Sequence, residues 1–198
     1  GWNNGIKGDL VLLIIVNQPV RGINGLLNCV KIEVMKYDIV IGIDPDIDKS
    51  GVAYLNVNNR TLEVSTLSFA QVVEYFNHVV EQKKAGQSVI VVVEASWMMK
   101  SNWHLKFGSR KEYAAATGYK VGQNHQTGKL ICEMARAIGL EVLEHAPLRK
   151  CWKGKDGKIT ADELQQITGL IGRTNQESRD AALLAWCYAN LPMRLKCQ

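Results

Sequence analysis

The sequence predicts an α/β protein built on one mixed five-stranded sheet, in which three antiparallel strands lead into parallel ones and helices flank the sheet. Two observations predict this class. Apolar segments follow one another in the order βββαβαβαα over residues 37–190, and the strand segment Ser88–Val93 is almost pure Val and Ile, as expected of a central strand buried on both faces. With 46% apolar and 22% charged residues, the 198-residue chain can bury one ordinary core.

The first three predicted strands run consecutively. Residues 37–44 are rich in Ile and Val and end in the carboxylate of Asp44. Residues 51–57 and 61–67 flank Asn58-Asn59, a polar pair that predicts a two-residue hairpin turn. A hairpin is therefore expected to follow the first strand.

Capping signals mark the starts of two helices. Ser68 and Gln71 form a capping-box pattern ahead of a helical stripe of Val and Phe, and Gly86 ends that helix. Thr160 with Glu163 repeats the pattern at the start of a later helix. Both helices are thus expected to begin at a side chain that accepts a backbone hydrogen bond.

The second half alternates strands with helices. Ser88–Val93 is a buried strand that runs into Glu94. Residues 95–120 are polar, basic and aromatic without a clean period, which predicts a long loop or a mobile helix. The remaining predictions are a helix over 121–138, a short strand over 141–145, a helical turn over 147–152, a loop over 154–158, a helix over about 160–170 and a last helix over about 176–190.

The first 34 residues differ in character from the rest. An apolar run, Leu10–Val16, precedes Asn17-Gln18-Pro19 and several glycines. One Lys precedes the run and no A-x-A site follows it, so a secretory signal is not predicted, and seven residues are too few to cross a bilayer. The run is either an additional strand or a short helix, or the segment is an extension before a natural start at Met35. We predict an N-terminal extension of unknown role over residues 1–34 and one domain over residues 35–198.

Charge and cysteine content narrow the functional class. The chain has 24 Lys+Arg against 19 Asp+Glu, a net charge of +5, which favours a polyanionic partner. Its five cysteines are widely spaced and form no CxxC pair, so neither a disulfide framework nor a cysteine zinc site is predicted. A reducing cytoplasm fits this cysteine usage best.

Four carboxylates stand at positions where they can meet. Asp44 and Glu94 each follow an apolar strand, and they project from the same edge if those strands are neighbours. Glu177 and Asp180 are three residues apart near a helix start and share one face. Such a cluster is unfavourable unless cations neutralise it, and Mg²⁺ prefers oxygen ligands of this kind. The alternative is that Glu177 and Asp180 are ordinary solvated helix charges.

Five motifs occur in order along residues 39–190. They are Ile41-Gly42-Ile43-Asp44-Pro45 with Gly51, Val92-Val93-Glu94 with Trp97 and Lys100, Val121-Gly122-Gln123, Ala146-Pro147-Leu148-Arg149-Lys150 with the 154–158 loop, and the stretch from Glu177 through Asp180 to Ala185. Together they resemble the RuvC-type Holliday-junction resolvases of the ribonuclease H-like superfamily. The chain departs from the family pattern at Asp46, where Gly is usual, and at Glu177, where Asp is usual.

The resemblance implies a ribonuclease H-like fold and a Mg²⁺-dependent, structure-selective endodeoxyribonuclease that cuts four-way (Holliday) DNA junctions. Asp44, Glu94, Glu177 and Asp180 would be catalytic residues that bind two Mg²⁺ ions, with Mn²⁺ as a substitute. One ion would activate the attacking water and the other would stabilise the leaving 3′-oxygen, giving 5′-phosphate and 3′-hydroxyl ends. Cutting two opposed strands calls for two symmetric sites, so the resemblance also implies a C2 homodimer and no membrane partner.

The basic residues gather in the middle of the chain. Between Glu94 and Lys158 there are twelve Lys/Arg against six Asp/Glu. Trp97 is a candidate for stacking on unpaired bases, although a core role is the alternative. Some of the basic residues are alternatively expected to be solubilising charges. The candidate phosphate contacts are Lys100, Lys106, Arg110, Lys111, Lys120, Arg149, Lys150, Lys153, Lys155 and Lys158.

Three other functions are alternatives to junction cleavage. A different ribonuclease H-like nuclease would use the same chemistry on flaps, other branched DNA, hybrids or mobile-element ends. An actin-like ATP-binding kinase also uses an Asp-terminated first strand, but it needs two such domains and a longer chain. A catalytically inactive DNA-binding relative would lack a carboxylate, whereas all four positions keep one here.

Overall fold

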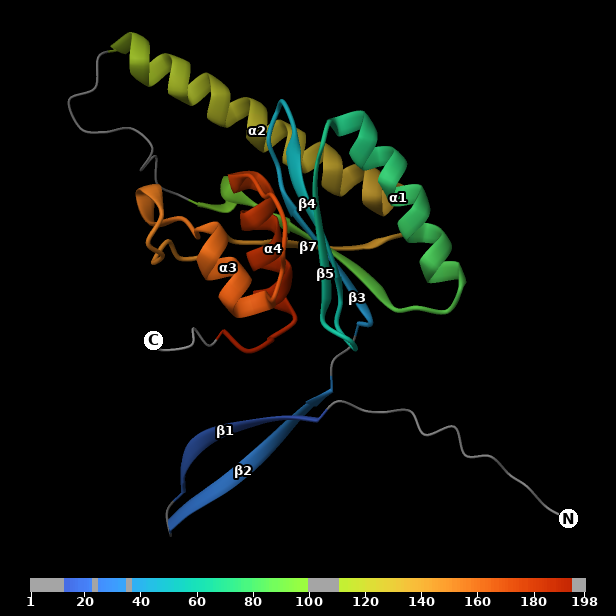
Figure 1. Cartoon of the computed structure of the whole chain (residues 1–198), viewed down its shortest axis with the longest axis vertical. Helices are drawn as coiled ribbons and strands as arrows, with labels where there is room; N and C mark the ends of the chain where they lie inside the picture. Colours follow the sequence, from blue (N-terminus) through green and yellow to red (C-terminus); the bar gives the residue numbers. More distant parts are fainter. Residues whose placement is uncertain (1–12, 23–24, 35–36, 100–110, 194–198) are drawn as a thin grey trace, which may run out of the picture. The chain divides into compact units, whose positions relative to one another are not determined.

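The structure is a computed structural model that describes residues 13–22, 25–34, 37–99 and 111–193, with side chains described over 37–99 and 115–193. The chain divides into two compact units, residues 1–36 and 37–198. In the first unit, β1 (Leu13–Gly22) and β2 (Gly25–Val34) form an antiparallel pair (Figure 1). The apolar run therefore enters a strand rather than a helix, and a separate role for this segment stays a prediction.

The second unit is built on the predicted mixed sheet. The strand order is β5-β4-β3-β6-β7, with β3 antiparallel to β4, β4 antiparallel to β5, and β3, β6 and β7 mutually parallel. Counted from β3, the strand order is 3-2-1-4-5. The bounds are β3 Ile39–Asp44, β4 Ser50–Asn56, β5 Thr61–Leu67, β6 Val89–Glu94 and β7 Glu141–His145.

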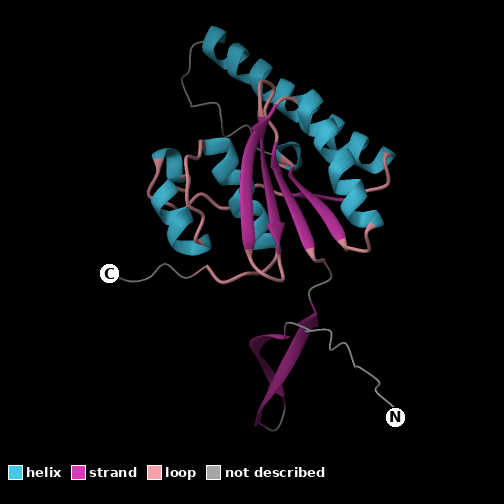
Figure 2. Ribbon diagram, turned by 45° about the vertical axis from the view of Figure 1, so that its right-hand side comes forward, coloured by secondary structure: helices cyan, strands magenta, loops and turns pink. Residues whose placement is uncertain are grey.

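Helices cover both faces of this sheet. In Figure 2, α1 and α2 lie on one side of the sheet, and α4 lies on the other with α3 outside it. No helix among the described residues is both long and apolar enough to span a bilayer. The bounds are α1 Phe69–Lys84, η1 Ser96–Met98, α2 Lys111–Ala137, η2 Lys155–Gly157, α3 Ala161–Thr168 and α4 Gln176–Tyr188.

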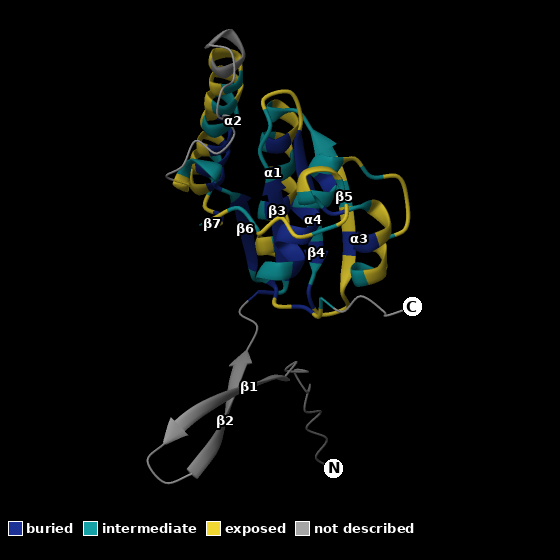
Figure 3. Cartoon of the chain, turned by 90° about the vertical axis from the view of Figure 1, so that its left-hand side faces the viewer, coloured by how far each residue is buried: buried dark blue, intermediate teal, exposed yellow. Residues whose placement is uncertain are grey.

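Strand alternation divides the interior into two layers. Ile39, Ile41 and Ile43 of β3 belong to one buried cluster with Phe76 of α1 and Ile131 of α2. The intervening positions of β3 turn to the opposite face, against which α4 packs its small side chains. Figure 3 shows the resulting buried layers on the sheet and on the inner sides of the helices. The even-numbered positions of β3, including Asp44, therefore face α4.

The predicted helix starts are confirmed by their caps. Ser68 and Gln71 form a reciprocal capping box at α1, and Thr160 and Glu163 form one at α3. These contacts satisfy backbone N–H groups that a helix leaves unpaired in its first turn. Asn175 caps α4 in the same way, and this cap sets where the acidic helix begins.

Three local predictions were wrong. The hairpin loop has four residues, Val57–Arg60, because the side chain of Asn56 accepts from the N–H groups of the next two asparagines and Arg60 takes a left-handed conformation. Helix α2 begins at residue 111, ten residues before the predicted start, so residues 111–120 follow the helix alternative given for residues 95–120. Residues 147–152 are irregular rather than helical, and the N–H of Trp152 pairs with the carbonyl of Gly157 in a tight loop.

Candidate active site

Two neighbouring parallel strands carry Asp44 and Glu94 to one edge of the sheet. Strands β3 and β6 run parallel, with Ile43 opposite Val93. The next residue on each strand is a carboxylate, Asp44 on β3 and Glu94 on β6. Both strands are almost wholly buried up to these last positions. The prediction that the two strands are neighbours is therefore confirmed, and their side chains line the same two cavities.

Two glycines allow α4 to approach this edge closely. A Cβ atom at Gly42 of β3 would lie 2.3 Å from the carbonyl oxygen of Ala181. A Cβ atom at Gly51 of β4 would lie 2.0 Å from the carbonyl oxygen of Glu177. Both distances are far below van der Waals contact, so only glycine permits the backbones to come together here. The close approach places the first turns of α4 beside Asp44.

The N-terminal part of α4 supplies the other two carboxylates. Asp180 lines the first cavity together with Asp44 and Glu94. Glu177 lines a second, adjoining cavity that shares Asp44 and Glu94 with the first. Both Glu177 and Asp180 are partly buried rather than fully exposed.

Burial and mutual repulsion dominate the electrostatics of this cluster. Burial, with the nearby charges of Glu94, Asp180 and Glu177, raises the pKa of Asp44 well above its ordinary value. Burial and the charge of Asp180 likewise raise the pKa of Glu94. The cluster thus holds more negative charge than its surroundings compensate, which is the environment that attracts a cation.

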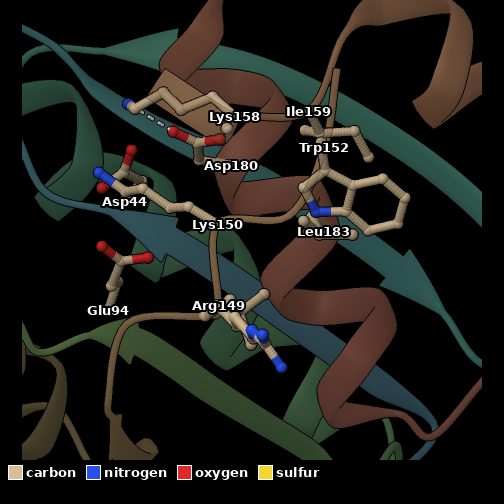
Figure 4. A pocket seen from close by; sticks show the side chains of 11 residues that line it. Asp44, Glu94, Arg149, Lys150, Trp152, Lys158, Ile159, Asp180 and Leu183 are labelled. Atoms are coloured by element: carbon tan, nitrogen blue, oxygen red, sulfur yellow. Dashed lines mark hydrogen bonds and ion pairs between the residues drawn. The ribbon is translucent and has the colours of Figure 1, made fainter. Parts of the chain in front are cut away.

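Lys158 supplies part of the compensating charge. Its ammonium donates to Oδ2 of Asp180 at 2.7 Å, and the side chains of the two residues are 34% and 16% exposed (Figure 4). Burial alone would lower the pKa of Lys158, but the hydrogen bond and the charge of Asp180 outweigh it, so the pKa is raised. Lys150 extends toward the same carboxylates, and its charge lowers the pKa of Glu94.

The donor set fits a hard divalent cation, because all four acidic groups offer carboxylate oxygens. The uncompensated charge around Asp44 and Glu94 points the same way. Over residues 37–99 and 115–193, however, no three acidic, His or Cys side chains are arranged to hold a single metal ion between them. The carboxylates instead line the walls of two joined cavities, with Lys158 bonded to one of them.

The predicted phosphate contacts divide into several groups. Lys150 and Lys158 line both cavities, and Arg149 lines the first. Lys120, Lys153 and Lys155 are exposed and line neither cavity. Lys100, Lys106 and Arg110, and the side chain of Lys111, lie outside the described residues.

Trp97 occupies a packed position beside the site. Its indole N–H donates to Oε2 of Glu144 at 3.1 Å, and its ring stands edge-on to His125, with centroids 6.3 Å apart. A Cβ atom at Gly128 of α2 would lie 2.4 Å from this ring. The tryptophan therefore forms part of the contact between η1, β7 and α2, and its stacking on DNA stays a prediction.

Sequence reasoning missed two features around the site. Asn124 of α2 accepts from the N–H of Ile47 at 3.0 Å and donates to Asp46 at 3.1 Å, which ties the loop after β3 to the helix. Trp152 forms part of the wall of the first cavity. The position of Trp152 next to the basic Ala146–Lys150 motif was the one available signal, since an aromatic residue among basic residues is typical of nucleic-acid sites.

Comparison with protein families gives no match, and comparison with curated proteins gives none either. Solved structures do match. The Thermus thermophilus RuvC in complex with a Holliday junction substrate is 21% identical, with 76% of this chain and 92% of that chain covered and a TM-score of 0.46. A second Thermus thermophilus RuvC structure is 18% identical, with coverage of 77% and 97% and a TM-score of 0.41. The large terminase nuclease of thermophilic phage G20c is 13% identical, with coverage of 88% and 93% and a TM-score of 0.29.

Proposed function

We propose that this chain is a Mg²⁺-dependent endodeoxyribonuclease that cuts phosphodiester bonds at four-way DNA junctions. One observation carries the proposal: Asp44, Glu94, Glu177 and Asp180, from three separate segments, line two joined cavities together with Lys158. Acidic groups that bind cations beside basic groups that bind phosphate are what metal-dependent phosphodiester cleavage requires.

The four carboxylates are the groups that would hold the metal. Two Mg²⁺ ions, or Mn²⁺ in their place, would supply a water of lowered pKa and neutralise the charge that develops on the leaving 3′-oxygen. Asp44 and Glu94 line both cavities and are the natural shared ligands. No nucleophilic side chain is needed, and the products are 5′-phosphate and 3′-hydroxyl ends.

Basic side chains around the first cavity position the DNA. Arg149, Lys150 and Lys158 line this cavity with the carboxylates, so a phosphate bound by them lies beside the acidic groups. The ammonium group of Lys158 is held in place by its hydrogen bond to Asp180. The exposed lysines Lys120, Lys153 and Lys155 would extend the contact along the backbone, where charge matters more than geometry.

The test is cleavage of an end-labelled four-way junction with Mg²⁺, and with EDTA in its place. Asp44→Asn is expected to reduce the cleavage rate by more than about a hundredfold, since losing even an outer partner of a metal costs about 10- to 100-fold. Junction binding measured without divalent ions is expected to persist in this variant. Asp48→Asn is the matched control, because it removes the same charge from an exposed neighbouring loop residue that lines neither cavity.

A substrate panel separates junction cleavage from related activities. Flaps, linear duplex and RNA–DNA hybrids are offered at the same concentration as the junction. Preferential cutting of the junction supports the proposal, whereas equal or faster cutting of another substrate assigns the chain to that activity. Cleavage by Asp44→Asn at the unmodified rate would contradict the assignment of Asp44.

A further inference from the structure

The first cavity has an apolar wall that neither metal binding nor phosphate binding uses. This wall is formed by Leu148, Trp152, Ile159 and Leu183. Figure 4 shows the indole of Trp152 beside Ile159 and Leu183, with Asp44 and Glu94 across the cavity. The cavity itself has a volume of about 70 Å³.

Trp152 is available for contact with a ligand. Its side chain is half-buried, and its indole N–H makes no hydrogen bond within the part of the chain that the structure describes. Ile159 is 1% exposed and Leu183 is 5% exposed, so they form a fixed apolar backing behind the ring. Trp97 differs, because its N–H is bonded to Glu144 and its ring packs against α2.

The loop that carries Trp152 is fixed before any ligand binds. The backbone N–H of Trp152 donates to Gly157, and that of Gly154 donates to Lys158. The carboxylate of Glu163 accepts from the N–H groups of Lys153 and Thr160 at 3.0–3.3 Å. Burial would raise the pKa of Glu163, but these hydrogen bonds outweigh it and lower the pKa, so the anchor is charged. A preformed wall reduces the ordering cost of binding.

This combination matches one chemical class. A nucleobase has flat apolar faces and polar edges, and the sugar that carries it is joined to a phosphate. The cavity offers the indole of Trp152 together with the basic side chains of Arg149, Lys150 and Lys158. A base stacked inside a duplex cannot enter such a pocket without leaving its neighbours, whereas an unpaired base at a branch point already has.

We propose that Trp152, Leu148, Ile159 and Leu183 form a subsite for one unstacked nucleobase next to the phosphate that is cut. The proposal rests on the nuclease function proposed above and adds to it the element of the substrate that is recognised. Stacking of one base on an aromatic side chain is a sequence-tolerant contact. The subsite thus selects branched DNA by the availability of an unstacked base rather than by base identity.

The test is a double-mutant cycle between protein and DNA. Binding of the full chain to a fluorescent four-way junction is measured by anisotropy in EDTA, with an abasic nucleotide placed in turn at each branch-point position. At one position, removing the base is expected to weaken binding of the unmodified protein about tenfold, equivalent to about 1.4 kcal/mol. Trp152→Ala is expected to weaken binding of the intact junction equally and to be insensitive to the abasic nucleotide.

Control variants keep the test decisive. Trp152→Phe retains an aromatic face and is expected to keep most of the coupling. Ile171→Ala, at an 84% exposed position outside the cavity, is expected to bind like the unmodified protein. If Trp152→Ala does not fold by circular dichroism, Leu148→Ala serves in its place, with an expected coupling of about threefold, or about 0.7 kcal/mol.

The outcomes separate this subsite from the nuclease itself. Additive effects of Trp152→Ala and the abasic nucleotide at every position would overturn the subsite. Coupling at one position supports the subsite even if Mg²⁺ produces no cleavage, in which case the nuclease proposal falls alone. Cleavage without coupling leaves the nuclease standing and removes the subsite.

Discussion

Lys158 is the basic residue that contacts the acidic cluster of this site directly. Its ammonium is half-buried and bonded to Asp180, and it lines both cavities. A cation in this place stabilises the acidic cluster, and under the proposed function it would also bind a phosphate of the DNA.

Lys158→Gln is expected to weaken DNA binding and to lessen its dependence on salt. Each lost phosphate contact makes the plot of log K against log salt concentration shallower by about 1. The measurement is an anisotropy titration of a junction at salt concentrations from about 50 to about 300 mM, where the affinity for DNA falls steeply with salt. Lys84→Gln is the control, because Lys84 is an exposed partner of Glu81 on α1. An unchanged slope would show that Lys158 serves Asp180 alone.

Asp38 shows how a single carboxylate ties the two central strands together. It stands just before β3, and its carboxylate accepts from the N–H of Ser88 at 2.8 Å and from the hydroxyl of Ser88 at 2.7 Å. Asn58 donates to the same carboxylate at 3.0 Å. The hydrogen bonds from Ser88 and Asn58 lower the pKa of Asp38.

The lowered pKa of Asp38 gives its contribution to stability a definite pH dependence. The contribution is fully present above the unfolded pKa of 3.8 and is lost as pH falls through the lower folded pKa. Asp38→Asn is therefore expected to reduce the free energy of unfolding by about 1–2 kcal/mol at pH 6 and by less near pH 3. Urea unfolding at both pH values checks this. Asp48→Asn, at an exposed position, should show no such difference, and an equal loss at both pH values would contradict the assignment.

Helix α4 can pack closely against the sheet because two sheet residues that face it are glycines, which have no side chain. Gly42 and Gly51 lie where any Cβ would collide with the α4 backbone. The contact of α4 with Gly42 and Gly51 therefore affects both the stability of the domain and the position of Glu177 and Asp180 relative to Asp44.

Gly51→Ala is expected to lower the free energy of unfolding by about 1–3 kcal/mol, because the new methyl must displace backbone atoms of α4. The same displacement is expected to reduce Mg²⁺-dependent cleavage in the molecules that stay folded. Gly118→Ala is the matched control: it adds a methyl in α2 with nothing within 4 Å, so it should leave stability equal or higher. Thermal unfolding and cleavage rates are measured for both. A fully active Gly51→Ala variant would contradict the conclusion that this close contact positions the carboxylates of α4.

The elements that the sequence predicts well are those fixed by local chemistry. Apolar strands such as Val89–Glu94 and caps such as Ser68 and Thr160 carry their own signals, and each is confirmed. Helix α2 begins early because residues 111–120 form a helix with no apolar period to mark it. Where side chains are exposed, as at Tyr119 and Lys120, no apolar face is buried and the sequence shows no helical periodicity.

The site was predictable only in part, for a related reason. Asp44 and Glu94 could be brought together because neighbouring parallel strands end at the same edge. The apolar wall around Trp152 could not, because it joins an irregular loop to Leu183 of α4 through the tertiary fold. The bond between Asn124 and Asp46 links residues 78 positions apart and leaves no trace in local sequence.

At the scale of the whole molecule, the proposed function calls for two sites related by a twofold axis. Sedimentation equilibrium is expected to give twice the chain mass of 22.1 kDa at micromolar concentration, with or without a junction present. The physical reason is that two opposed strands must be cut in one complex. A mass of one chain, both free and on the junction, would contradict the homodimer.

The two outer strands of the sheet limit how such a pair could form. Edge strand β5 shows solvent the polar side chains of Thr61, Glu63 and Ser65, and edge strand β7 carries Glu141 and Glu144. Charged edges discourage the addition of a strand from another molecule. Two copies would accordingly each keep a separate five-stranded sheet rather than share a continuous ten-stranded one.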